Sequence, residues 1–296
     1  MPERQPALET AIEQAACDLY IRSLKDLPGD VKIALQRARD SETEPLPRRI
    51  METICRNVEV ADEKDMLVCQ DTGLVVFLVN LGADFPLAGL DPEGALRRGV
   101  ERATVEHPLR SSSTHPLTRQ QTPTNSGTRV PIVHYRITPG DDTMEVVCIP
   151  KGSGSENMSF LKMLVPAAGI EGAKRFVIDC VVEAGANPCP PTVVGVGLGG
   201  TADLCMQLAK EAIARPCGSR NPDPLIAEFE EEMLARINSL GIGPQGLGGR
   251  TTALAVNAEY AHTHITLNPV AVNIQCWAAR RAGARIHPDG RIEELE

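Results

Sequence analysis

The segment LVCQDTGLVVFLVN, residues 67–80, places a thiol, an amide, a carboxylate and a hydroxyl side by side within an apolar run. A cysteine such as Cys69 binds metals as its thiolate, and a carboxylate such as Asp71 can transfer protons or accept hydrogen bonds. Taken alone, Asp71 could equally cap a backbone turn. Because buried polar groups need partners, the block indicates that a strand ends here at a cavity.

Two other cysteines stand in unusual settings. Cys189 lies between prolines in NPCPP, which we expect to hold its thiol on a rigid, extended turn. Cys276 ends an apolar segment in AVNIQCWAARR. Cys217, beside a glycine in a loop, stays undecided. The others fall inside predicted helices or a strand and are interpreted as small buried hydrophobes: Cys17, Cys55, Cys148, Cys180 and Cys205. With no C-x-x-C pair, spacing alone leaves open whether any of them binds a metal.

Composition limits the partners of the chain. The formal charge of −9 on 296 residues excludes nucleic acid and anionic membrane, both of which need a basic surface. No apolar run approaches the roughly 18–20 residues of a membrane span, and the first residues lack an apolar signal region. We therefore expect a cytoplasmic protein. Aromatic residues make up 3% of the chain, so the core must be aliphatic.

The periodicity of apolar residues predicts the elements that position these groups. Helices are expected at 7–24, 31–39, 46–60, 91–106, 169–184, 201–214 and 223–240. Strands are expected twice within 66–81 and at 130–137, 144–149, 192–198, 253–260 and 265–274, with a terminal hairpin over 287–296. Polar loops are expected at 109–131 and 151–159. Without regular βαβ alternation, the pattern favours an α+β (mixed α/β) fold, with a sheet flanked by helices.

The glycine-rich GVGLGG, Gly195–Gly200, matches the dinucleotide pattern G-x-G-x-x-G between a predicted strand and helix. However, no parallel strand follows that helix directly, and no acidic residue ends a strand about 20 residues later. We interpret these glycines as allowing close backbone packing, or the approach of a ligand other than a nicotinamide nucleotide.

Five blocks carry a resemblance to a known family: CQDTG, KGSGSENMS, NPCPPTVVGVGLGGTAD, GIGPQG and PVAVNIQCWAAR, in this order. They resemble the iron–sulfur hydro-lyases, namely class I fumarases and the α-subunits of tartrate dehydratase, over about residues 50–286. The resemblance implies one catalytic domain of the class I fumarase N-terminal (α) type over residues 1–296. Residues 1–45 would form a helical extension packed on it.

The resemblance also implies a cofactor. Cys69, Cys189 and Cys276 would bind a [4Fe–4S] cluster, and three thiolates leave one iron of a cubane without a protein ligand. That iron can act as a Lewis acid on the hydroxyl group that leaves the substrate. Three cysteines and a histidine could instead bind zinc, although zinc would leave the glycine-rich loops unexplained.

The same resemblance assigns roles at the substrate. Asp71 would transfer a proton or bind the leaving hydroxyl, and Gln70 would contact a substrate carboxylate. Arg110 would pair with a carboxylate by bidentate hydrogen bonds. Lys151 would add positive charge, and the bare backbone N–H of Gly152 would approach the substrate.

His264, in HTHIT, matches a family histidine that contacts substrate and is counted with Asp71 as catalytic. His262 is its rival, because the two would lie on one face of a strand. Glu156 and Asn157 are expected to orient the loop that begins at Lys151. For each of these residues a structural role is the alternative.

The one-chain fumarases carry a further domain, whereas this chain ends at Glu296. The resemblance therefore implies an α-subunit that works with a separate β-subunit of the swivelling-domain type. The assembly would be an αβ hetero-oligomer or a homodimer of α. KGSGSEN favours reversible hydration of fumarate to L-malate, and Ser153 leaves tartrate or mesaconate as alternatives. A non-catalytic cluster-binding or redox-sensing protein is the alternative of another class.

Overall fold

The computed structural model describes residues 6–107 and 109–295, which fall into two compact units. Unit 1 comprises Met1–Pro28, Ala61–Gly152 and Arg280–Glu296, and unit 2 comprises Gly29–Val60 and Ser153–Ala279. The described residues do not include 1–5, 108 and 296. Residues 1–5 belong to the predicted helical extension and 296 to the predicted hairpin, and all of them belong to the predicted domain. One domain over 1–296 stays a prediction, and each unit is described by itself.

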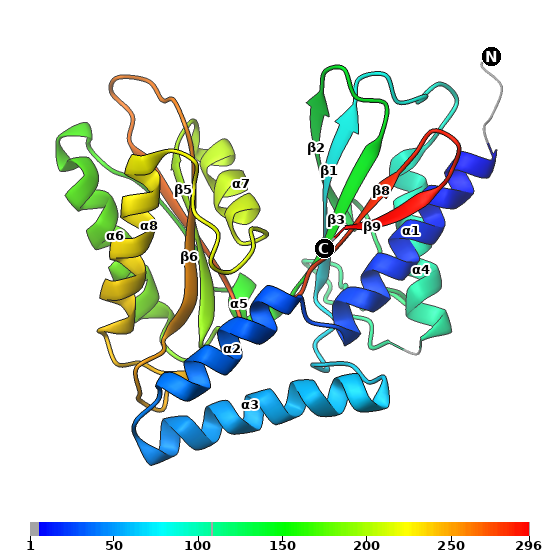
Figure 1. Ribbon diagram of the computed structural model, residues 1–296. Helices are drawn as coiled ribbons and strands as arrows, with labels where there is room; N and C mark the ends of the chain where they lie inside the picture. The colour runs from blue at the N-terminus through cyan, green and yellow to red at the C-terminus, as the bar shows by residue number, and fades with distance from the viewer. Residues whose placement is uncertain (1–5, 108, 296) are drawn as a thin grey trace. The chain divides into compact units, whose positions relative to one another are not determined.

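Unit 1 contains a mixed sheet. Its strands are β1 (Leu74–Gly82), β2 (Ile132–Thr138), β3 (Met144–Lys151), β8 (Ala282–Ile286) and β9 (Ile292–Leu295). They are arranged in the order β2-β1-β3-β8-β9 (Figure 1). β1 and β2 are parallel, and the other neighbours are antiparallel. β8 and β9 form a terminal hairpin, but its first strand ends at Ile286, before the predicted range of 287–296.

Two helices, α1 (Pro6–Lys25) and α4 (Pro92–Glu106), pack against one face of this sheet (Figure 1). Helix α4 begins as the sequence predicted, because the Asp91 carboxylate accepts a hydrogen bond from Gly94 N at 2.9 Å and Pro92 occupies the first turn. Residues such as Ile12, Phe77 and Val100 are fully buried in the core that the helices and sheet share. This core is largely aliphatic, as the composition required.

Unit 2 contains a second sheet, with strands β4 (Ser159–Met163), β5 (Thr192–Gly199), β6 (Ala253–Ala261) and β7 (Pro269–Gln275). Their order is β4-β7-β5-β6, with β5 and β6 parallel and the other neighbours antiparallel. The helices of the unit are α2 (Gly29–Ser41), α3 (Pro45–Lys64, of which 61–64 belong to unit 1), α5 (Ser153–Glu156), α6 (Gly169–Ala184), α7 (Ala202–Ala212) and α8 (Pro224–Asn238), with 3₁₀ turns at Pro166–Ala168 and Pro244–Gly246.

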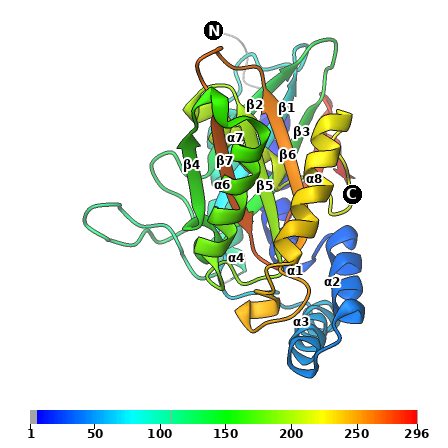
Figure 2. The same cartoon turned by 90° about the vertical axis from the view of Figure 1, so that its left-hand side faces the viewer.

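Helices α6 and α8 cover one face of this sheet, and α7 covers the other (Figures 1 and 2). The glycines of GVGLGG explain how closely α7 approaches. A Cβ atom on Gly197 would lie 2.0 Å from the carbonyl oxygen of Cys205, and one on Gly195 would lie 2.3 Å from that of Ala209. The interpretation of these two glycines as allowing close backbone packing is confirmed.

The α+β class, with helices flanking sheets, is confirmed, and two local predictions are wrong. Residues 66–73 form no strand, because Val68 N donates to the Leu24 carbonyl of α1 at 3.0 Å instead of to a neighbouring strand. The loop predicted over 151–159 contains α5 and the start of β4.

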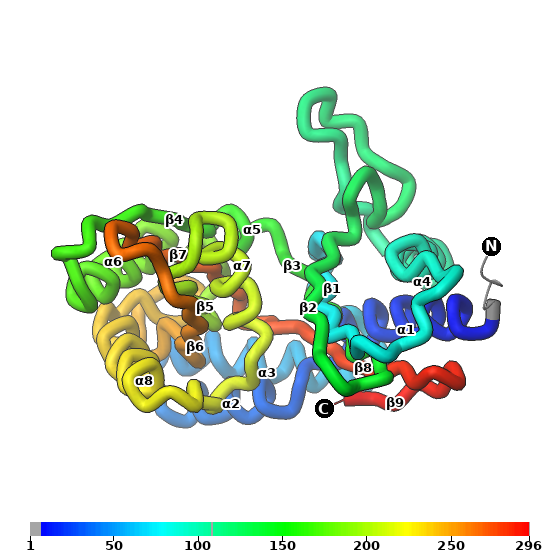
Figure 3. The backbone as a smooth tube through the Cα atoms, turned by 90° about the horizontal axis from the view of Figure 1, so that it is seen from above, coloured from blue at the N-terminus to red at the C-terminus, as the bar shows by residue number. Residues whose placement is uncertain are grey.

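The expected loop between α4 and β2 is present, and Figure 3 shows it as a long excursion from the sheet of unit 1. It is held by its own short contacts, including an isolated bridge between Thr114 and Gln121. Among the described helices, none has the length and apolar character that crossing a membrane requires.

The packing of α7 predicts the effect of adding one methyl group. Gly197→Ala should lower the free energy of unfolding by at least about 2 kcal/mol, because a buried backbone atom must move to admit the Cβ. Gly29→Ala is the matched control, since no atom lies within 4 Å of its added Cβ. Urea unfolding of both variants measures the difference. Equal stability of the two variants would contradict this account of the packing.

Candidate active site

The CQDTG block forms a tight turn before β1. Gly73 N donates to Asp71 Oδ1 at 3.0 Å, so one carboxylate oxygen caps the turn. Gly73 has φ +71°, and a Cβ there would lie 2.7 Å from the carbonyl carbon of Pro150. The turn therefore presses against the end of β3, and only glycine fits at this contact.

Thr72 attaches the long loop of unit 1 to this turn. Its hydroxyl donates to the Arg110 carbonyl at 2.7 Å and lies 2.8 Å from Ser112 Oγ. Asn125 Nδ2 donates to the same Arg110 carbonyl at 3.1 Å. The backbone of Arg110 is thus fixed beside the turn, while the Arg110 side chain and that of Gln70 are exposed.

Lys151 and Gly152 stand at the end of β3, opposite the same turn. Lys151 is 2% exposed, and burying an ammonium group is costly unless the protein pairs it. The position that a Cβ of Gly152 would take lies 3.3 Å from Asp71 Oδ2, the second oxygen of that carboxylate. Unit 1 therefore brings together Asp71, Lys151, Gly152 and the backbone of Arg110, as one site requires.

Arg280 also belongs to this group and was missed by the sequence analysis. Arg280 is 2% exposed, and its guanidinium donates from Nη1 to the Asp71 carbonyl at 2.6 Å. The signal that could have indicated it is the PVAVNIQCWAAR block, whose last residue is Arg280. Only Cys276 of that block was given a role.

Unit 2 brings the other two cysteine segments together. Trp277 N, next to Cys276, donates to the Cys189 carbonyl at 3.1 Å. Gln245, in the GIGPQG block, donates from its backbone N at 2.7 Å and its side chain at 3.0 Å to the Pro190 carbonyl. Three separate sequence blocks therefore meet at one end of this unit.

The backbone at Cys189 differs from the prediction. Cys189 has φ +54° rather than an extended conformation. Its N–H donates to the Ala186 carbonyl at 3.0 Å, which closes a turn that the flanking prolines alone did not indicate. The thiol is exposed, and that of Cys276 is half-buried and lies 3.5 Å from the Ala278 carbonyl.

The cysteines divide as the sequence predicted. Five cysteines are buried, namely Cys17, Cys55, Cys148, Cys180 and Cys205. The other four are not buried: Cys69, Cys189, Cys217 and Cys276. Burial raises the pKa of Cys148 and Cys180 to about 12 and that of Cys205 to about 11. Burial also raises the pKa of Cys17 and of Cys55. These five thiols are poor metal ligands, because only a thiolate binds metal well.

Glu156 has a clear structural partner. Its carboxylate lies 2.5 Å from Lys210 Nζ of α7, and Asn273 Nδ2 of β7 donates to it at 3.3 Å. These contacts tie the segment after Gly152 to the sheet of unit 2, which suits the orienting role expected for Glu156.

The two histidines lie in a loop after β6, not on a strand face as predicted, because β6 ends at Ala261. Both are exposed. His264 Nδ1 lies 2.8 Å from Thr266 Oγ1, and the His262 ring lies 6.4 Å from that of Tyr260. Each histidine therefore has a local contact, and burial does not favour either of them as the substrate-binding residue.

Within residues 6–107 and 109–295, no three His, Cys, Asp or Glu side chains form a group that could bind a metal ion. Of the three predicted cluster ligands, Cys69 belongs to unit 1 and Cys189 and Cys276 to unit 2. Their chemistry fits a cluster: all three thiols, like that of Cys217, are at least partly exposed, unlike the five buried cysteines. Two of the three lie in segments joined by a hydrogen bond.

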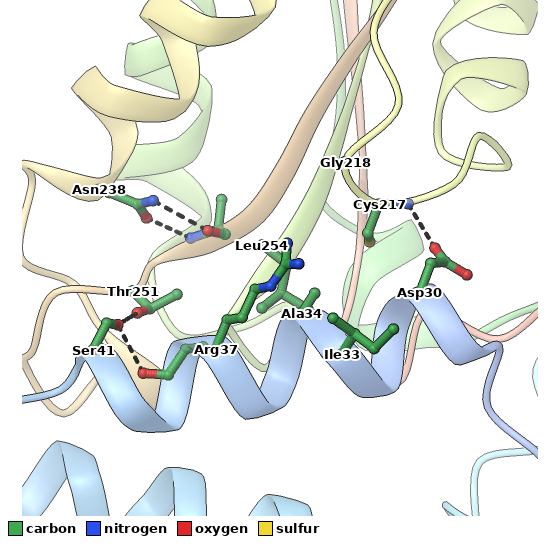
Figure 4. Close-up of a pocket in the computed structure, with 12 residues that line it drawn as sticks. Asp30, Ile33, Ala34, Arg37, Ser41, Cys217, Gly218, Asn238, Thr251 and Leu254 are labelled. Atoms are coloured by element: carbon green, nitrogen blue, oxygen red, sulfur yellow. Dashed lines mark hydrogen bonds between the residues drawn. The ribbon is translucent and has the colours of Figure 1, made fainter.

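A separate pocket of about 520 Å³ in unit 2 contains none of the predicted site residues (Figure 4). Its polar groups largely bond to one another: Cys217 N donates to Asp30 Oδ2 at 2.6 Å, and Ser41 Oγ lies 3.4 Å from Thr251 Oγ1. Asn238 is likewise bonded to the backbone of β6. This pocket resembles a packed junction between α2 and the sheet more than a site prepared for a ligand.

These features define a mixed α+β protein with a carboxylate, a buried cation and accessible thiols near glycine-rich turns. The sequence model of the family described as "Fumarate hydratase (Fumerase)" matches residues 13–285. The chain therefore belongs to this family of hydro-lyases.

Two relatives show how far the likeness extends. The chain is 42% identical over 283 residues to the "Putative L(+)-tartrate dehydratase subunit alpha" of Methanocaldococcus jannaschii, covering 95% of this chain and 99% of that protein. It is 37% identical over 269 residues to the "L(+)-tartrate dehydratase subunit alpha" of Escherichia coli K12, covering 91% and 88% respectively.

The division of the cysteines predicts their reactivity. In the protein without metal, iodoacetamide at pH 8 should alkylate Cys189 well before Cys148, Cys180 or Cys205. A thiol with a pKa of about 12 is ionised in only about one molecule in ten thousand at pH 8, and burial also excludes the reagent. Mass spectrometry of timed samples measures the order, with urea-unfolded protein as the control in which all react. If the buried thiols of the native protein are alkylated as fast as Cys189, the predicted order of reactivity is wrong.

Proposed function

We propose that this chain is the α-subunit of an iron–sulfur hydro-lyase that removes water from, or adds it to, a small dicarboxylate. The observation that carries the proposal is that Asp71 Oδ2 lies 3.3 Å from the position a Cβ of Gly152 would take, next to the buried Lys151. A carboxylate, a cation and a bare stretch of backbone at one point suit a substrate that must be held by its carboxylates and lose a proton.

The proposed cofactor is a [4Fe–4S] cluster bound by Cys69, Cys189 and Cys276. When bound, such a cluster offers an iron without a protein ligand, which acts as a Lewis acid on the substrate hydroxyl. Support comes from the family and from the accessibility of these three thiols beside five buried ones.

The chain's own residues would prepare the substrate for loss of water. The Gly73 N–H holds Asp71 Oδ1, and Oδ2 lies 3.3 Å from the position that a Cβ of Gly152 would take. From there Asp71 would accept or return a proton. Lys151 would attract a substrate carboxylate, and the missing side chain at Gly152 lets the substrate approach the backbone. Arg110 and Gln70 are exposed beside the turn and would bind a carboxylate as it enters.

His264 stays a proposed second catalytic residue. Its loop follows β6, and its exposed ring would have to receive the substrate from solvent or from a second chain. His262 is the matched comparison, two positions earlier on the same loop.

L(+)-tartrate is one proposed substrate, because the relatives from M. jannaschii and E. coli carry that name over most of this chain. Fumarate, with hydration to L-malate, is the other, because KGSGSEN resembles the fumarase form of that loop. Mesaconate remains an alternative. In the removal of water from tartrate a carboxylate-bearing carbon loses its hydroxyl and the neighbouring carbon loses a proton. In the hydration of fumarate the same kinds of carbon gain a hydroxyl and a proton, so the two reactions need similar groups around the substrate.

We further propose that a β-subunit completes the enzyme, in an αβ hetero-oligomer or with a homodimer of α. Support comes from the relatives, which are named as alpha subunits. The cytoplasm is the proposed location, since the nine cysteines, all in the described part of the chain, form no disulfides.

A non-catalytic cluster protein or redox sensor is disfavoured by Lys151. Lys151 is 2% exposed, and burying a lysine has a desolvation cost that a scaffold for a cluster alone does not require. A substrate dicarboxylate gives that charge a use.

The test is turnover by the protein prepared without oxygen, loaded with iron and sulfide, and combined with a β-subunit of a family member. L(+)-tartrate, fumarate and mesaconate are supplied in turn, and at least one should be dehydrated or hydrated. Asp71→Asn should lower kcat about 100-fold or more, the size of a lost acid–base catalyst, without loss of iron.

Asp141→Asn is the matched control, because Asp141 Oδ1 accepts from Thr143 N at 2.9 Å in the same kind of turn. It should leave turnover unchanged. Iron-loaded protein that turns over none of the three acids would overturn the proposed function. Equal activity of the two variants would return Asp71 to a turn-capping role only.

A further inference from the structure

Consecutive backbone carbonyls of the CQDTG turn are bound by buried side chains from distant parts of the chain. Arg280 Nη1 donates to the Asp71 carbonyl at 2.6 Å, and Tyr20 Oη of α1 donates to the Thr72 carbonyl at 3.1 Å. Arg280 is 2% exposed and Tyr20 is 0% exposed. The turn that presents the Asp71 carboxylate is therefore fixed through its main chain, from two sides.

Arg280 also reaches the opposite wall of the site. Its Nη2 lies 3.5 Å from the carbonyl of Pro150, the residue before Lys151 and Gly152. A guanidinium is planar and rigid, so it can hold two acceptors in a fixed relation that a flexible ammonium cannot. One side chain therefore sets the CQDTG turn against the end of β3.

The geometry at Gly152 shows what this relation controls. The position of a Cβ at Gly152 lies 3.3 Å from Asp71 Oδ2 and 3.8 Å from Arg280 Nη2. The carboxylate, the guanidinium and the bare backbone thus surround one small space. Arg280 Nε is buried and has no hydrogen-bond partner among the described residues, so the guanidinium is not fully satisfied by the fold.

A buried arginine is an expensive structural device. Its desolvation costs free energy, and an apolar side chain of similar volume often stabilises a protein as well. The incomplete bonding of Arg280 makes this cost larger. Stability alone therefore accounts poorly for an arginine here, whereas the placement of a catalytic carboxylate accounts for it directly.

We propose that Arg280 is the positioning residue of the active site, and that with Tyr20 it clamps the main chain at Asp71 and Thr72 so that Asp71 Oδ2 faces Gly152. The catalytic consequence rests on the proposed function. The clamp itself concerns only the order of the turn, and it can be measured without turnover.

The experiment compares Arg280→Lys with Arg215→Lys in the iron-loaded protein. Arg215 is a matched control, because its Nη1 also donates to a backbone carbonyl, that of Ala258 at 3.2 Å, and pairs with the buried Glu230 at 2.6 Å. Tyr20→Phe removes the second half of the clamp with little change in shape, and it serves if Arg280→Lys does not fold.

The first readout is hydrogen exchange at the Gly73 amide, which bonds the Asp71 carboxylate. Exchange there should become at least tenfold faster in Arg280→Lys and Tyr20→Phe and stay within twofold of wild type in Arg215→Lys. The second readout is kinetic: kcat should fall at least tenfold while KM changes less than threefold, because substrate-binding groups stay and only the carboxylate is misplaced. Iron per chain should not change.

The proposed clamp is wrong if Arg280→Lys and Tyr20→Phe show the same Gly73 exchange rate and the same kcat as Arg215→Lys. Arg280 would then be a structural residue only. Faster exchange with unchanged kcat in an active wild-type background would overturn the positioning role. A wild-type protein that is inactive on every dicarboxylate overturns the proposed function instead, and the exchange at Gly73 then decides the clamp on its own.

Discussion

The site depends on one constraint, which is that the backbone of a polar turn set against a protein core must have its hydrogen bonds satisfied. The turn at Asp71–Gly73 meets it with donors from two other parts of unit 1 and with one of its own N–H groups. Tyr20 of α1 binds one carbonyl, Arg280 binds another, and the Gly73 N–H binds the Asp71 carboxylate. Because these partners are buried, the direction of the carboxylate follows from the packing of the whole unit.

Unit 2 applies the same constraint to the cysteine segments. The turn at Cys189 is closed by its own N–H, and the Cys189 and Pro190 carbonyls receive hydrogen bonds from Trp277 and Gln245. Behind it, Gly195 and Gly197 let α7 approach β5 at distances that no Cβ would permit. An exposed thiol on a well-anchored turn suits a metal ligand, because the backbone need not reorganise when the metal binds.

The sequence predicted the elements whose information is local. Helix α6 runs from Gly169 to Ala184 as its apolar periodicity indicated, and α4 begins where Asp91 and Pro92 indicated. It failed where the deciding contact is distant. The segment before β1 is not a strand, because Val68 N bonds to the Leu24 carbonyl of α1. The local pattern of residues does not indicate this contact.

The same division holds at the site. The sequence blocks that resemble the family singled out Asp71, Lys151 and Gly152, which unit 1 brings together. They did not indicate Tyr20 or Arg280, because the partners of these side chains are main-chain carbonyls 52 and 209 positions away. A carbonyl is present at every residue, so its importance at Asp71 and Thr72 appears only in three dimensions.

The central claim is that three accessible cysteines bind an iron–sulfur cluster for hydro-lyase chemistry. The most direct measurement is iron and acid-labile sulfide per chain in protein prepared without oxygen, for the wild type, Cys189→Ser and Cys180→Ser. We expect about four of each in the wild type and in Cys180→Ser, the stoichiometry of a cubane, and little of either in Cys189→Ser. Two results would contradict the account. One is wild-type protein that contains zinc or no sulfide. The other is a Cys189→Ser variant that keeps its iron while Cys180→Ser loses it.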